Sequence, residues 1–205
     1  MFDYANYNQL SYLESTGTQW IELNYYADWD KDLIKIKCNW TSNGVYQMIL
    51  SFGGTEAKAG WLYSYASTSR VTFYHFNNSG SQSGLDYCSQ SESLNTHEYI
   101  LDLKNKLGLF DNNNIGSTNT SISSTSPYKI RLFSGGGSYA EQYLTSGKIY
   151  EFTLIRDGNI TLNLIPAQRR SDGVLGLYDE KNNVFYTNQG TGTFIAGNTV
   201  GGGEF

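Results

Sequence analysis

The sequence predicts an all-β protein, folded as one domain of two antiparallel sheets packed as a β-sandwich. The chain of 205 residues contains 17 tyrosines and 22 glycines but only 2 prolines, and such compositions favour short strands and tight turns. Roughly a dozen strand-like segments recur at spacings of about 8–15 residues, as in sandwiches and barrels. Tyr139–Thr145 offers the only helical candidate, and its pattern is weak.

The first strands follow a short polar lead-in. Residues 1–9 have no periodicity and are predicted to be an N-terminal arm that precedes the domain, residues 10–197. An alternating segment at Gln19–Leu23 leads into a charged turn at residues 27–32. Leu33–Trp40 then alternates most clearly. Its inward face is predicted to consist of Ile34, Ile36, Cys38 and Trp40.

The middle of the chain alternates between apolar segments and turn-like segments. The Gly/Ser-rich stretches 79–84 and 134–138 are expected to be loops, and Asp111–Asn114 a turn. Strands are expected at residues 46–52, 60–66, 71–76, 97–103, 107–110 and 128–133.

The C-terminal part is predicted to form hairpins. Asp157-Gly158 lies between two alternating segments, residues 148–155 and 159–165, and is a strong hairpin signal. Two further strands, at 174–178 and 184–187, precede a last apolar segment at 194–196. Residues 198–205 are expected to be a flexible tail or a remnant of expression.

Two stretches, Tyr12–Ile21 and Asp172–Phe194, resemble the concanavalin A-like, laminin-G-like jelly-roll domains of bacterial surface proteins and bacteriophage structural proteins. Residues 98–103, 107–110 and 147–154 fit the usual strand rhythm of that family, so the resemblance covers about residues 10–197. It implies a jelly roll whose first and last strands are neighbours. It also implies an attachment or glycan-binding module.

Charge and hydropathy narrow the range of partners. The net charge is −5 and the pI about 5.0, which argues against nucleic acid or an anionic membrane surface as partner. No apolar segment approaches the roughly 20 residues of a membrane helix, and the N-terminus does not resemble a signal peptide. Cys38 and Cys88 are interpreted as buried free thiols, with a disulfide left open.

The sequence offers no catalytic set. The glucanases that the jelly-roll family includes carry Glu-x-Asp-x-x-Glu on one strand, because retaining hydrolysis needs carboxyls roughly 5 Å apart. Neither Glu98–Asp102 nor Glu151–Asp157 has that spacing. His75 and His97 lie in strand-like segments, where a structural histidine is the usual case. No catalytic residue is therefore predicted.

A metal site is not predicted either. The carboxylate and amide oxygens of Asp111–Asn114 are the ligands that calcium prefers, and related sandwiches bind calcium in such loops. An asparagine-rich turn that tolerates positive φ explains the same residues. We expect no cofactor, with calcium as the one open alternative.

The candidate binding residues are aromatic. Trp61, Tyr63 and Tyr65 alternate along one segment, so they share one face of a strand, and Tyr74 comes from the next strand. Sugars stack on tryptophan and tyrosine rings, and the same residues serve protein interfaces. The alternative is that this ladder faces the core.

The sequence thus predicts a non-enzymatic binding and attachment module. The expected role is a bacteriophage virion protein (tail, fibre or capsid decoration) that recognises host-surface carbohydrate, with the virion favoured over the bacterial cell surface. Symmetric appendages imply a homo-oligomer, with a trimer as one option. The alternatives are a structural domain that binds a neighbouring virion or surface protein, and a glycoside-active enzyme.

Overall fold

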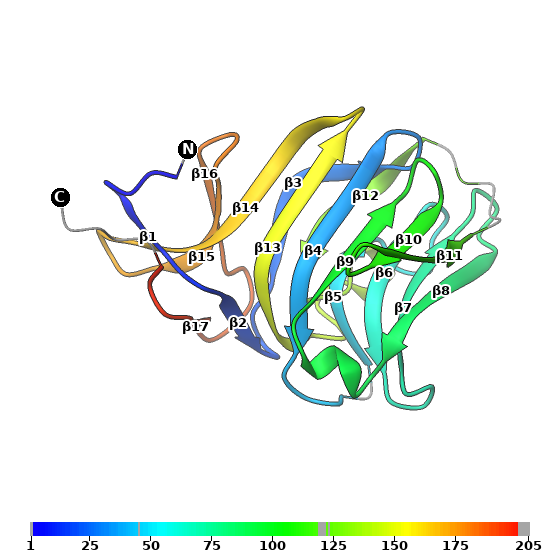
Figure 1. Cartoon of the computed structure of the whole chain (residues 1–205), viewed down its shortest axis with the longest axis horizontal. Coiled ribbons are helices and arrows are strands. Elements are labelled where there is room, and N and C mark those ends of the chain that lie inside the picture. Colours follow the sequence, from blue (N-terminus) through cyan, green and yellow to red (C-terminus); the bar gives the residue numbers. More distant parts are fainter. Residues whose placement is uncertain (1, 45, 119–121, 123, 201–205) are drawn as a thin grey trace.

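Two antiparallel β-sheets stack face to face in the computed structural model, which describes residues 2–44, 46–118, 122 and 124–200 (Figure 1). The larger sheet has the strand order β11-β10-β9-β4-β13-β14-β15-β16. In addition, β1 pairs with β14, and β2 pairs with β13 and β17. The smaller sheet has the order β3-β12-β5-β6-β7-β8. The predicted all-β jelly-roll sandwich of one domain is confirmed.

The strands of the larger sheet are β1 (Tyr7–Gln9), β2 (Leu13–Thr16), β4 (Asp32–Trp40), β9 (His97–Asp102), β10 (Leu107–Phe110), β11 (Asn113–Ser117), β13 (Ser146–Arg156), β14 (Asn159–Arg169), β15 (Leu175–Asp179), β16 (Val184–Thr187) and β17 (Ile195–Ala196). Those of the smaller sheet are β3 (Ile21–Asp28), β5 (Tyr46–Phe52), β6 (Gly60–Tyr65), β7 (Arg70–Phe76), β8 (Gln82–Ser89) and β12 (Thr125–Leu132). Two short 3-10 turns complete the described elements: η1 (Glu92–Leu94) and η2 (Gly137–Tyr139).

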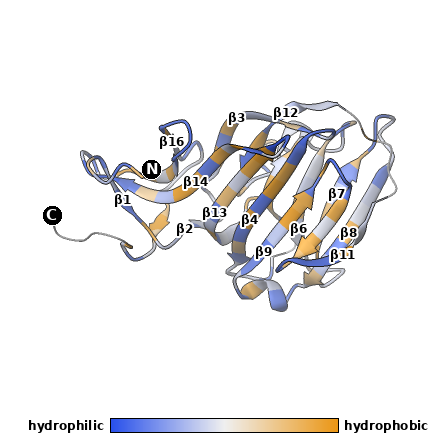
Figure 2. Cartoon of the chain, turned by 45° about the horizontal axis from the view of Figure 1, so that its top comes forward, coloured by the Kyte–Doolittle hydropathy of each residue, from blue (hydrophilic) through white to orange (hydrophobic). Residues whose placement is uncertain are grey.

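The main hydrophobic core lies between the two sheets. On β4, Ile34, Ile36, Cys38 and Trp40 are all fully buried, as their alternation predicted. Leu62 on β6 and other apolar side chains of the smaller sheet belong to the same cluster. Hydrophobic and hydrophilic residues alternate along the strands in Figure 2, because successive side chains of a strand point to opposite faces.

The sequence did not predict the N-terminal strand β1 or the strands β8 and β11. Gln82–Ser89 forms β8 and Asn113–Ser117 forms β11, and both lie at sheet edges. An edge strand with many solvent-facing side chains lacks the hydrophobic alternation by which strands are recognised. The helical candidate at residues 139–145 was wrong, since only the 3-10 turn Gly137–Tyr139 touches this region.

The first residues of the chain are integrated into the larger sheet. Strand β1 pairs with β14, with Tyr7 opposite Arg169. Phe2 is buried and its ring lies 5.3 Å from that of Tyr178. At the other end, Val200 donates a backbone hydrogen bond to the carbonyl of Gln9. The segment predicted as an arm therefore packs on the sandwich, and residues 201–205 lie outside the described residues.

The two ends of the domain meet as the resemblance implied. Strand β2 pairs on one side with β13 and on the other with β17. The Gln19 side chain donates to the carbonyl of Thr193 at 3.1 Å. The predicted Asp157-Gly158 hairpin is also present, and its positive φ angles of 49° and 79° are those of a type I′ turn.

Two remaining expectations concern thiols and membranes. Cys38 and Cys88 are free, and burial raises the pKa of Cys38 well above its usual value and that of Cys88 to about 11. In the part of the chain that the structure describes, no helix is long and apolar enough to span a membrane.

Candidate functional site

The four predicted binding residues lie on the outer face of the smaller sheet. Along β6, Leu62 points into the core between the sheets, whereas Trp61, Tyr63 and Tyr65 point the opposite way. Tyr74 on β7 joins them, directly across the strands from Trp61. The ladder therefore belongs to a cluster separate from the main core between the sheets.

The ladder is nevertheless partly covered, because it belongs to a second hydrophobic cluster. Trp61 and Tyr63 are only 5% and 6% exposed, whereas Tyr65 and Tyr74 are half-buried. We call this group the aromatic cluster; its members are Met48, Ala59, Trp61, Tyr63, Tyr65, Tyr74, Phe76, Tyr139 and Tyr143. Its floor is packed and its rim remains accessible.

Two members of the aromatic cluster come from the loop between β12 and β13. The ring of Tyr139 meets that of Trp61 edge to face at 5.7 Å, and Tyr143 packs against Tyr139 at 4.8 Å. On the opposite side, Tyr46 of β5 stacks on Tyr65 at 3.9 Å. The sequence did not reveal these three tyrosines: Tyr139 and Tyr143 come from a loop, which shows no strand periodicity, and Tyr46 is the first residue of β5.

A carboxylate holds this loop over the sheet. Glu56 accepts hydrogen bonds from the backbone N–H groups of Gly54, at 2.6 Å, and of Ser138. Gly137 has a φ of +54°, and a Cβ there would lie 2.7 Å from the backbone nitrogen of Gly54. Only glycine allows this close approach of the two chain segments. This contact between the two segments places the Tyr139 ring against that of Trp61.

The aromatic cluster encloses a hollow of about 200 Å³. The residues that line it are uncharged side chains from strands β5 to β8 and two loops: Tyr46, Met48, Thr55, Trp61, Tyr63, Tyr74, Phe76, Gln82, Tyr139 and Tyr143. A hydrogen bond with Tyr65, together with burial, raises the pKa of Tyr46 to about 12. Burial and the neighbouring Tyr74 raise the pKa of Tyr63 above that of Tyr46. These hydroxyls therefore stay neutral at physiological pH and can donate and accept hydrogen bonds.

Polar residues continue the outer face beyond the aromatic cluster. Asp86 on β8 accepts a hydrogen bond from the Thr72 hydroxyl at 2.7 Å and pairs with the Arg70 guanidinium at 2.6 Å. Thr72 lies directly across from Tyr63, and Arg70 across from Tyr65. We call Arg70, Thr72 and Asp86 the polar edge.

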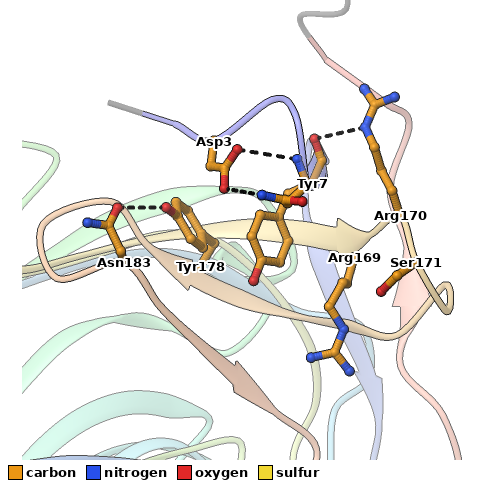
Figure 3. Close-up of a pocket in the computed structure, with 8 residues that line it drawn as sticks. Asp3, Tyr7, Arg169, Arg170, Ser171, Tyr178 and Asn183 are labelled. Carbon is orange, nitrogen blue, oxygen red and sulfur yellow. Dashed lines mark hydrogen bonds between the residues drawn. The ribbon is translucent and has the colours of Figure 1, made fainter.

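A second hollow, of about 300 Å³, lies where the N-terminal segment packs on β14 and β15 (Figure 3). Its polar groups largely bond to one another. Asp3 accepts from the backbone N–H groups of Ala5 and Asn6, and the Tyr178 hydroxyl donates to Asn183. The residues that line this hollow therefore serve to hold the N-terminal segment on the sandwich.

The histidines have structural surroundings. His75 is fully buried, with its ring 5.6 Å from that of Trp29, and burial lowers its pKa to about 4. His97 contacts the Asp111 carboxylate through Nδ1 at 2.7 Å and the Glu92 carbonyl through Nε2.

The residues considered for calcium are also engaged. Asp111 accepts from His97 and from the backbone N–H of Glu98, and the Asn114 side chain accepts from the N–H of Gly116. Over the described ranges, no group of three or more His, Cys, Asp or Glu side chains could hold a metal ion. Asp111–Asn114 is explained as a hydrogen-bonded turn.

Comparison with known proteins identifies the fold. No protein-family model matches the chain, and a search of curated protein sequences also found no match. A solved Bacteroides ovatus protein, assigned provisionally to carbohydrate binding, is similar with a TM-score of 0.62 and 11% identity; the match covers 93% of this chain and 61% of that one.

A second similar structure is the CBM40 module of the Ruminococcus gnavus IT-sialidase, bound to α2,3-sialyllactose. It has a TM-score of 0.52 and 17% identity, and the match covers 74% of this chain and 92% of that one. At these identities the likeness extends to the fold alone. The chain is thus similar in architecture to jelly-roll sandwiches that include carbohydrate-binding modules.

Proposed function

We propose that this protein is a non-enzymatic carbohydrate-binding module and that the aromatic cluster is its binding site. The observation that carries the proposal is an uncharged hollow, lined by tyrosines and one tryptophan, on an outer sheet face. Aromatic rings offer apolar faces to the CH groups of a sugar, while neutral tyrosine hydroxyls can bond its hydroxyls. Trp61, Tyr63, Tyr65 and Tyr74 are the residues to which we assign this role.

The fold supports the proposal by analogy. The Ruminococcus gnavus module was solved with a bound sialylated sugar, and the Bacteroides ovatus protein carries a provisional carbohydrate-binding assignment. A shared fold hosts many functions, so the chemistry of the aromatic cluster remains the main argument.

The biological role that we propose is attachment. The two stretches that resemble jelly-roll domains, Tyr12–Ile21 and Asp172–Phe194, support a bacteriophage virion protein (tail, fibre or capsid decoration) that recognises a host-surface glycan. A bacterial cell-surface protein is the alternative location. A homo-oligomer, such as a trimer, would multiply weak glycan contacts into strong attachment. Light scattering of the purified protein measures the oligomeric state, and a monomer would contradict the proposed homo-oligomer.

A second candidate function is a purely structural one, in which the same aromatic face binds a neighbouring virion or surface protein. It is favoured by the composition of the rim, because tyrosine and tryptophan are enriched in protein interfaces. Co-purification of a particle protein without any glycan binding would establish this alternative.

A glycan array, read with the wild type and with two matched variants, tests the carbohydrate proposal. We expect Tyr74→Ala to weaken binding about tenfold, or about 1.4 kcal/mol, because a stacking face is lost. Tyr26→Ala is the control, since Tyr26 is a 41% exposed tyrosine on β3 of the same sheet. Trp61→Ala should abolish binding, with its folding checked by thermal unfolding.

Three results would contradict the proposal. Glycan binding that survives Trp61→Ala and Tyr74→Ala would place the site elsewhere. An array without any bound glycan would remove the carbohydrate function. Release of reducing sugar from a host polysaccharide would show that the protein is an enzyme.

A further inference from the structure

The charges around the hollow narrow the class of sugar that it can hold. No side chain that lines it carries a charge. The Glu56 carboxylate holds the loop that carries Tyr139 and contributes to raising the pKa of Tyr139. An acidic sugar would lose hydration at its carboxylate without gaining a cation, which is unfavourable. The electrostatics therefore favour a neutral ring.

The polar edge extends the same face in the direction of β8. Its single cation, Arg70, is already paired with Asp86, and their side chains are 58% and 46% exposed. Only Nη1 of the guanidinium bonds to Asp86, and a guanidinium has five N–H donors. The pair is thus an oriented set of donors and acceptors with little net charge, which suits the hydroxyl groups of a neutral sugar.

Between the hollow and the polar edge lies a glycine, which has no side chain to separate them. Gly84 on β8 lies directly across from Tyr74, and a Cβ there would be 3.2 Å from both the Tyr74 ring and the Thr72 methyl group. The φ angle of Gly84 is outside the positive range, so the backbone does not require glycine. Its lack of a side chain leaves the edge of the Tyr74 ring uncovered.

We infer that the site binds a neutral oligosaccharide of at least two rings. One ring occupies the hollow of the aromatic cluster, and the next passes over Gly84 to meet Arg70, Thr72 and Asp86. This inference rests on the proposed function and adds the class of ligand and a second subsite. Residues two apart on a strand are about 7 Å apart, so Tyr74 and Thr72 present successive contacts on the scale of adjoining rings.

The first experiment is an array that carries each glycan core both with and without terminal sialic acid. We expect binding to neutral cores and at least tenfold weaker binding to their sialylated forms. The bound core is then titrated as its monosaccharide and its disaccharide, and the disaccharide should bind at least tenfold more tightly.

Variants of the polar edge locate the second ring. Asp86→Asn, which keeps the shape of the side chain, and Gly84→Val should reduce disaccharide affinity towards that of the monosaccharide and leave monosaccharide affinity unchanged. Lys104→Gln is the control, because Lys104 forms a comparably exposed ion pair with Asp157, and both residues lie in turns that connect strands of the larger sheet. Thermal unfolding checks each variant, and Asp86→Asn decides the outcome if Gly84→Val does not fold.

The possible failures are distinguishable. Preference for sialylated forms, or equal affinity for one ring and two, overturns this inference while the carbohydrate proposal stands. Disaccharide binding that neither variant weakens overturns the second subsite. An array without any bound glycan overturns both the inference and the proposed function.

Discussion

An ion pair between the fully buried Asp32 and the partly exposed Arg156 joins two neighbouring strands at the start of β4. Arg156 on β13 donates to both carboxylate oxygens of Asp32, at 2.7 and 2.8 Å, and also to the carbonyl of Tyr26. Asp32 is fully buried and accepts a further bond from the backbone N–H of Asp28. The hydrogen bond to Asp32 raises the pKa of Arg156. The charged turn predicted at residues 27–32 is present, and hydrogen bonds tie it into the fold.

Removal of the arginine should destabilise the protein strongly. Arg156→Met leaves the Asp32 carboxylate buried without its cation, which typically costs about 3–5 kcal/mol. Arg169→Met is the matched control, because Arg169 makes the same two-pronged contact with the exposed Asp172. Exposed pairs contribute about 0–1 kcal/mol. Urea unfolding measures the free energy of unfolding of both variants. Equal losses of stability would contradict the role of the buried carboxylate.

At the scale of elements, the N-terminal strand depends on a small cluster of its own. Phe2, Ala167 and Tyr178 are buried together, apart from the main core, and Tyr7 packs on Tyr178 at 4.6 Å. Strand β1 pairs with β14 over only three residues. So short a strand gains most of its stability from the side chains that anchor it.

Loss of this small cluster should open strand β1 locally. Phe2→Ala should expose the N–H groups of β1, because the deleted ring leaves a cavity that costs about 3–5 kcal/mol. Hydrogen exchange should accelerate by at least tenfold at Tyr7–Gln9 and stay unchanged in β4. Val184→Ala, at a 41% exposed position on β16, is the control. Unchanged exchange in β1 would show that pairing alone holds the strand.

At the scale of the whole molecule, stability depends on pH through the core between the sheets. His75 is buried there with a pKa of about 4, below its ordinary 6.5, because burial penalises the charged ring. Two carboxylates affect stability at lower pH. Hydrogen bonds with Arg169 lower the pKa of Asp172 below its ordinary 3.8. Burial alone would raise the pKa of Asp111, but the hydrogen bonds from Glu98 and His97 outweigh it and the pKa is lowered.

We expect the folded state to lose stability between pH 6.5 and pH 4. Over that range the unfolded chain binds a proton at His75 that the folded chain does not, so stability falls as the pH falls, by up to about 3 kcal/mol. Urea unfolding at pH 7 and pH 4.5 measures the loss. His75→Gln should show a smaller difference between the two pH values than the wild type. Identical differences would mean that other groups are responsible.

Several features could be predicted from the sequence because they depend on local patterns. The period-two alternation of β4 placed Ile34, Ile36, Cys38 and Trp40 on one face, and that of β6 placed Trp61, Tyr63 and Tyr65 on one face. Asp157-Gly158 favours positive φ at both positions and thereby sets a hairpin. In each case the relevant interactions lie within a few residues along the chain.

Only the tertiary structure decided the rest. Alternation shows which side chains share a face, but which face meets the other sheet depends on strands far away in the chain. For this reason the sequence left open whether Trp61 lies in the core between the sheets. It also could not pair Asp32 with Arg156, 124 residues further on, or bring Tyr139 over Trp61 from a loop without periodicity. The sequence determined the strands and the aromatic ladder; the packing of the sheets decided that the ladder faces outward and encloses a hollow.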